Sequence, residues 1–229
     1  MNANRKNFEH ANLEIKDLET VEKNGQRRYI TPDGNAYPSV TTVLSILSEK
    51  FIAAWKARVG EEEAAKVSYR ASQRGTAVHE IIEKYLYNET EYAKGYMPNI
   101  LDNFSSVRGI LDERIGKVYA QECALYSDHL CLAGRVDCVA EFDGKISIID
   151  FKTAKRKKYR SGIKQYFQQE AAYAIMFEER TGLPVSQLVT IIAVDDDEPQ
   201  VFIERRDEWA PELKKTIDVF NKRENASNA

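Results

Sequence analysis

Two acidic residues and a lysine in the middle of the chain could support metal-assisted chemistry. They are Asp137, Asp150 and Lys152. Between the two acids lies Asp143-Gly144, a strong signal for a two-residue hairpin turn. If these two residues form the turn, the register places Asp137 directly opposite Asp150 on the neighbouring strand. Two carboxylates in that position repel each other unless they share a proton or a cation.

Strand alternation adds a positive charge to this pair, because Lys152 lies on the same face as Asp150, one step along the strand. Two carboxylates beside an ammonium group, set among Val, Ile and Ala, are suited to hold Mg²⁺ or Mn²⁺. The alternative is a salt-bridge cluster at the end of a sheet, which is costly inside apolar strands. The pattern therefore favours a metal site over a structural ion pair.

The elements that must position these residues form the second half of the chain. Three sequential antiparallel strands are expected, followed by a long helix that ends at Gly182 in the left-handed conformation. Two more strands and a closing helix complete this half. The expected strands cover 119–126, 132–142, 145–151, 186–194 and 200–205, and the expected helices cover 161–180 and 208–220. We expect an α/β (α+β) fold, with a central mixed sheet flanked by helices.

The first half of the chain is expected to be mostly helical. A short hairpin is predicted over 28–38, and Ser39 or Thr41 could cap the helix that follows. Two or three helices are expected over 51–88 and another over 100–118. We therefore expect residues 1–118 to form a hairpin and helical N-terminal lobe, 119–220 a core and 221–229 a loose tail, all in one compact unit.

The order of the candidate motifs resembles the PD-(D/E)xK nuclease superfamily, in its RecB-like exonuclease branch. An upstream histidine, a strand acid, an Asp-x-Lys pair and a helix with Gln and Tyr occur in sequence. The matching residues are Arg74–Glu80, Gly134–Asp137, Asp150-x-Lys152 and Tyr166-x-x-Gln169-x-x-x-Tyr173. Tyr37–Thr42 and Trp55 are similar to the mitochondrial genome maintenance exonuclease subgroup. The resemblance implies a restriction-endonuclease-like core, although Val136 stands where the superfamily's name has proline.

The resemblance also implies roles for the residues that match the motifs. His79, Asp137, Asp150 and the backbone carbonyl of Phe151 would bind the metal. Lys152 would orient the attacking water or stabilise charge on the phosphoryl oxygens, so Asp137, Asp150 and Lys152 are the expected catalytic residues. Without the motifs, His79 would be read as a border residue of an amphipathic helix.

Glu122 lies outside these motifs, on the first expected strand of the core. We expect it opposite the region before Gly134, where it could help to coordinate the metal or pair with Arg135. The sequence leaves these two alternatives open.

Several aromatic and basic residues are candidates for contact with a nucleic acid. Tyr166, Gln169 and Tyr173 share a helical face, where they would brace the site or hold the strand, or simply bury on the sheet. Lys155, Arg156 and Lys157 lie in a stretch from residue 152 to residue 164 with seven Lys or Arg and no acid. They would contact phosphates, as would Arg74, unless the stretch is only a solvated loop.

Composition limits the class of protein. The 229 residues carry a net charge of −3, which excludes a histone-like basic protein, and no apolar run approaches the length of a membrane span. No import signal is visible, so a cytoplasmic enzyme of bacterial or phage origin is expected. The expected partner is DNA, single-stranded or with a free end, and no membrane; the sequence does not identify protein partners.

The sequence and the resemblance together predict a metal-dependent DNA exonuclease. Two alternatives stay open: a structure-specific endonuclease, and a non-catalytic nucleic-acid-binding module with a nuclease fold. The intact set of two acids and a lysine argues against the non-catalytic module.

Overall fold

A five-stranded sheet lies at the centre of the molecule in the computed structural model, which describes residues 5–23 and 25–227. Its strands follow one another in chain order across the sheet. They are β4 (Ile115–Ser127), β5 (Leu132–Phe142), β6 (Lys145–Ala154), β7 (Gln187–Val194) and β8 (Gln200–Arg205). The predicted mixed sheet flanked by helices is confirmed.

The sheet is mixed because one connection crosses over a face. Strands β4, β5 and β6 pair antiparallel, β6 and β7 pair parallel, and β7 and β8 pair antiparallel. Parallel neighbours need a long crossover, which α5 (Lys164–Thr181) supplies. This helix ends as predicted at Gly182, whose φ of 74° is left-handed and whose N–H donates to the carbonyl of Glu178.

The turn between β5 and β6 has the predicted two residues. Asp143 and Gly144 both have positive φ, at 52° and 75°, which is the requirement of a type I′ turn. Phe142 therefore pairs with Lys145, and the same register continues along both strands.

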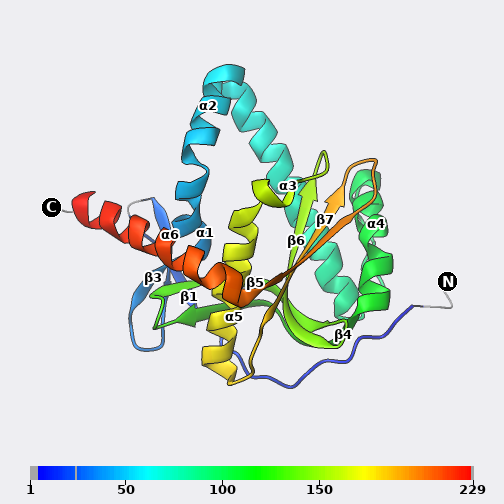
Figure 1. The fold of residues 1–229 in the computed structure, drawn as a ribbon. Coiled ribbons are helices and arrows are strands. Elements are labelled where there is room, and N and C mark those ends of the chain that lie inside the picture. The colour runs from blue at the N-terminus through cyan, green and yellow to red at the C-terminus, as the bar shows by residue number, and fades with distance from the viewer. Residues whose placement is uncertain (1–4, 24, 228–229) are drawn as a thin grey trace.

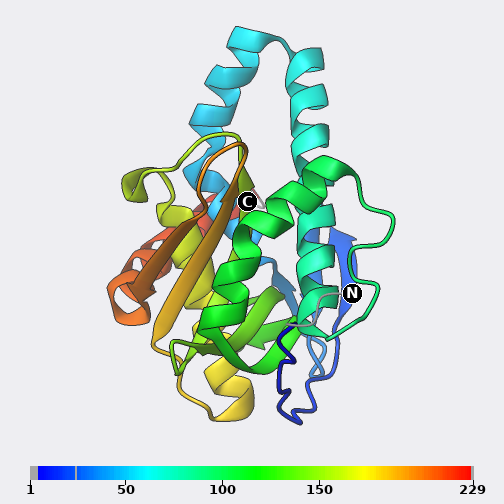
Figure 2. The same cartoon turned by 90° about the vertical axis from the view of Figure 1, so that its right-hand side faces the viewer.

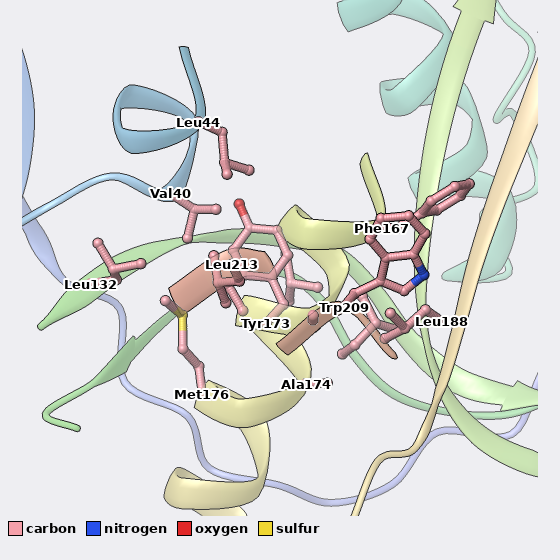
Figure 3. Close-up of a cluster of buried hydrophobic side chains, with 14 of the residues drawn as sticks. Val40, Leu44, Leu132, Phe167, Tyr173, Ala174, Met176, Leu188, Trp209 and Leu213 are labelled. Atoms are coloured by element: carbon pink, nitrogen blue, oxygen red, sulfur yellow. The ribbon is translucent and has the colours of Figure 1, made fainter. Parts of the chain in front are cut away.

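Helices cover both faces of the sheet. On one face α5 and α6 (Arg206–Ser227) bury a cluster in which Tyr173 and Met176 of α5 lie near Leu213 of α6 (Figure 3). On the other face α3 (Glu61–Leu86) and α4 (Pro98–Arg114) enclose a second cluster (Figure 2). The two apolar layers hold the sheet between the helices and thereby fix the positions of the polar side chains that its strands carry.

A small three-stranded sheet precedes the helices. The predicted hairpin is present as β2 (Gln26–Ile30) and β3 (Ala36–Pro38), and β1 (Glu19–Lys23), which the sequence did not indicate, joins it. Ser39 caps α1 (Val40–Leu44) by accepting a hydrogen bond from the N–H of Thr42. A 3₁₀ turn, η1 (Ser45–Leu47), leads from α1 into the next helix.

A helical arm rises from the body of the molecule (Figure 1). It consists of α2 (Glu49–Val59) and the first half of α3, joined at Gly60, whose φ is 87°. No residue of α2 is buried, and continuous burial in α3 begins only near Val78. The arm therefore packs against the body mainly where α2 begins and where α3 reaches Val78.

Some boundaries differ from those expected. Helix α4 ends at Arg114 and the chain enters β4 directly, so the expected boundary at residue 118 falls inside a strand. Helix α6 continues through Ser227, within the stretch expected to be a loose tail, of which residues 228–229 lie outside the described residues. The division into an N-terminal lobe and a core stays a prediction. In the described part of the chain, no helix is long and apolar enough to cross a bilayer.

Two glycines should respond in opposite directions to substitution by alanine. Gly182→Ala places a Cβ in a left-handed cap and should lower the free energy of unfolding by about 1 kcal/mol. Gly109→Ala, inside α4 with open space around it, should raise that free energy by about 0.5–1 kcal/mol. Urea denaturation measures both, and a stabilising Gly182→Ala would contradict the assigned cap.

Candidate active site

Three acidic residues lie in one row across adjacent strands of the central sheet. Gln121 pairs with Cys138 and Cys123 pairs with Val136, so Glu122 of β4 lies opposite Asp137 of β5. The ladder between β5 and β6 runs from the turn to the pair of Cys138 and Ile149. Continued by one residue, the same register places Asp137 opposite Asp150. The expected position of Glu122, opposite the region before Gly134, is wrong because β4 continues to Ser127, opposite Leu132, and the ladder runs unshifted from that pair past Glu122.

Asp137 is the centre of this row. One of its oxygens, Oδ2, accepts a hydrogen bond of 2.9 Å from the backbone N–H of Phe151 and lies 3.5 Å from Nδ1 of His79. Ligand atoms of His79, Glu122 and Asp137 all lie within 4.8 Å of one another. An imidazole nitrogen and two carboxylates at this spacing can share one divalent cation.

Asp150 is buried at 2% exposure and contacts the lysine of the motif. Its Oδ2 lies 2.5 Å from Nζ of Lys152, and its Oδ1 accepts a hydrogen bond of 3.2 Å from Gln169. Burial raises the pKa of Asp150 to about 6; Lys152 lowers that pKa and Asp137 raises it. The side chain of Asp150 thus pairs with Lys152 and adjoins the group formed by His79, Glu122 and Asp137.

Lys152 is positively charged in this setting. Burial lowers its pKa, but the charges of Asp150 and Asp137 outweigh burial and hold the pKa above its ordinary value. Its ammonium group lies 5.2 Å from the ring centroid of Tyr166, which adds a cation–π contact.

Arg135 forms its ion pair with Asp17 and not with the carboxylate of Glu122, although its charge lowers the pKa of Glu122. Nη2 of Arg135 lies 2.6 Å from a carboxylate oxygen of Asp17, and Nη1 donates to the backbone oxygen of Glu122. Burial, reinforced by the charge of Asp137, raises the pKa of the Glu122 carboxyl to about 7. The backbone of Glu122 has a φ of 43°, which is strained for a residue with a side chain. Glu122 had two alternative roles, coordination of a metal or an ion pair with Arg135, and the geometry favours metal coordination.

Helix α5 braces the row from the other side. Gln169 holds Asp150, while Tyr166 lies against Lys152. Tyr173 is buried at 3% exposure, and a Cβ at Gly134 would lie only 2.9 Å from its ring. These contacts position the strands of the site; contact of Tyr166, Gln169 and Tyr173 with a nucleic acid stays a prediction.

Glu170 is a buried acid that the sequence analysis did not single out. It has no exposed surface, and it accepts a hydrogen bond from Oγ1 of Thr190, the partner of Asp150 in the β6–β7 ladder. Burial, followed by the charge of Asp150, raises its pKa well above the ordinary value. Its one sequence signal is an acid set inside the otherwise apolar half of α5.

The basic candidates lie outside the row. Lys155, Arg156 and Lys157 are exposed just after β6, and Nζ of Lys157 lies 2.7 Å from Asp197. Arg74 forms an ion pair with Asp195, an acid that the sequence did not connect with it. Their contact with phosphates stays a prediction.

The chain belongs to the PD-(D/E)XK nuclease superfamily, whose family model matches residues 104–226. That range contains Asp137, Asp150 and Lys152, and the likeness predicted from the motif order is confirmed.

Three animal proteins named mitochondrial genome maintenance exonuclease 1 are similar to the chain. The mouse protein is 32% identical over 54% of this chain and 39% of its own length, and the human protein is 34% identical over 54% and 38%. The Xenopus tropicalis protein is 30% identical over 71% of this chain and 50% of its own length. The chain thus spans half or less of these relatives. Their animal origin gives no support to the expected bacterial or phage source.

A solved structure from Eubacterium rectale, described as that of a candidate exonuclease, aligns with a TM-score of 0.44 and 16% identity. The alignment covers 67% of this chain and 65% of that one.

The close approach of Gly134 to Tyr173 gives a test of the packing under the site. Gly134→Ala should lower the free energy of unfolding by about 1–3 kcal/mol, because the added methyl group meets the ring at 2.9 Å. Gly162→Ala is the matched control, since open space surrounds that glycine. Equal midpoints of urea denaturation for the two variants would contradict this packing.

Proposed function

We propose that this chain is a divalent-metal-dependent DNA exonuclease that hydrolyses phosphodiester bonds of single strands or free DNA ends. Membership of the nuclease superfamily supports the reaction class. The single observation that carries the proposal is the convergence of His79, Glu122 and Asp137 beside the Asp150–Lys152 pair.

The residues of the row fit a divalent cation. His79, Glu122 and Asp137 offer one nitrogen and two carboxylate ligands within reach of one another, and Asp150 and the carbonyl of Phe151 complete the proposed set. The carboxylates suit Mg²⁺ or Mn²⁺, and the imidazole favours Mn²⁺ relative to an all-oxygen site. When bound, such an ion supplies Lewis-acid activation of water and of the scissile phosphate.

The protein's own groups orient and stabilise the reacting atoms. Lys152, kept protonated beside Asp150, orients the attacking water or stabilises negative charge on the phosphoryl oxygens. Gln169 fixes the rotamer of Asp150 by donating to its Oδ1. Inline attack of water then leaves a 5′-phosphate and a 3′-hydroxyl on the products.

The arm supports a preference for single strands or ends. Helix α3 carries both the arm and His79, so a strand that follows the arm is led toward the row of acids. Phe51 and Tyr69 on the arm are exposed at 75% and 66%, and such aromatic faces can stack on unpaired bases. Lys155, Arg156 and Lys157 after β6, with Arg74, contact the phosphates.

Substitutions in the row should separate catalysis from folding. Asp150→Asn and Lys152→Ala should each abolish Mg²⁺-dependent degradation of end-labelled single-stranded DNA, while circular dichroism shows a folded protein. Lys145→Ala, at the exposed far end of β6, is the matched control and should keep wild-type activity. Activity retained by both site variants would refute the assigned site.

A circular single strand distinguishes the exonuclease from the endonuclease alternative in the same assay. We expect the wild-type protein to degrade the linear strand and leave the circle intact, since the proposed enzyme needs an end. Cleavage of the circle would replace the exonuclease proposal with the endonuclease.

A further inference from the structure

A pocket of about 660 Å³ lies between α3 and the segment that leads into α4. Its walls are mainly apolar and come from side chains that are unusually exposed. Tyr69 and Met97 are exposed at 66% and 69%, and Ala71 and Tyr96 line the same space. The OH of Tyr96 accepts a hydrogen bond of 2.9 Å from Nζ of Lys84, which anchors that ring.

The same pocket carries positive charge. Arg70, Arg74 and Lys155 line it, and no acid is among its lining residues in the described part of the chain. Asp195 pairs with Arg74 from outside the lining. Among the described residues, neither Arg70 nor Lys155 forms an ion pair with an acid. Their positive charges therefore lie at the pocket without a protein counter-ion.

Two elements, α3 and β6, connect the pocket with the candidate active site. Arg74 precedes His79 by five positions on α3, which is a rise of about 7.5 Å along the helix and a rotation of about 140° around it. Lys155 follows Lys152 by three positions, a separation of about 10 Å along an extended chain. A DNA strand that has one phosphate at the row of acids and passes around α3 can therefore place a nearby nucleotide in the pocket.

We propose that this pocket binds one unpaired nucleotide of the substrate strand, next to the bond that is cut. Tyr69, Tyr96 and Met97 take the base, and Arg70 and Lys155 take the adjoining phosphates. Aromatic faces with cations and no acid match a nucleotide in shape and charge. The nature of the strand rests on the proposed function, but binding in the pocket does not require hydrolysis.

The test blocks the pocket without touching the row of acids. Ala71→Trp fills it, and Ala65→Trp, on an exposed α3 position outside the lining, is the matched control. Binding of a fluorescein-labelled ten-residue oligothymidylate is followed by fluorescence anisotropy in chelator. We expect Ala71→Trp to weaken binding about tenfold, in line with the loss of one stacked base, and Ala65→Trp to bind like wild type. Tyr69→Ala, which removes a wall instead of filling the space, should weaken binding similarly.

The outcomes separate the pocket from the nuclease proposal. Equal affinities for Ala71→Trp, Tyr69→Ala and Ala65→Trp, or no binding by wild type, would overturn the pocket. Pocket-dependent binding by a wild-type protein that degrades no DNA with Mg²⁺ or Mn²⁺ would support the pocket and overturn the nuclease proposal. If both hold, Ala71→Trp should raise KM for the oligonucleotide about tenfold and leave kcat close to the wild-type value.

Discussion

Electrostatic crowding of three carboxylates on adjacent strands is the constraint on which the rest of the structure depends. Glu122, Asp137 and Asp150 lie in one row, where burial and the charge of Asp137 raise the pKa values of Glu122 and Asp150. Such a row persists only if cations or bound protons compensate its charge. Lys152 compensates Asp150 within the protein, and we propose that His79, Glu122 and Asp137 bind an external ion. Burying ionised groups costs stability, which the two apolar layers around the sheet offset.

The elements around the row each fix one part of it. The two-residue turn sets the register that brings Asp137 opposite Asp150, and α5 clamps Asp150 through Gln169. Helix α3 delivers His79 from the opposite face and extends beyond the body as the arm. One helix therefore joins a proposed metal ligand, His79, to the surfaces that we propose for the DNA strand, so a shift of the arm's base would also move His79.

The sequence was most informative where local chemistry decides the conformation. Asp143-Gly144 determined a turn and, through it, the register of the acids, and Gly182 determined the end of α5. The motif order gave the superfamily because its residues sit at fixed places on the sheet and helices. The position of Glu122 was mispredicted, because it depends on which residues close the ladder at the β4–β5 loop, and there Ser127 pairs with Leu132. The pairing of Arg74 with Asp195 and the burial of Glu170 were also missed, since both depend on how distant segments pack.

Thermal unfolding of Asp137→Asn at pH 8, with chelator and with Mn²⁺, tests the central claim most directly. The amide can still accept the hydrogen bond from Phe151, so the substitution chiefly removes one negative charge from the row. The account predicts that in chelator the variant unfolds at a higher Tm than wild type, by a stabilisation of about 1 kcal/mol. It also predicts that Mn²⁺ raises the Tm of wild type but not of the variant. A variant that is less stable in chelator and gains as much from Mn²⁺ as wild type would contradict it.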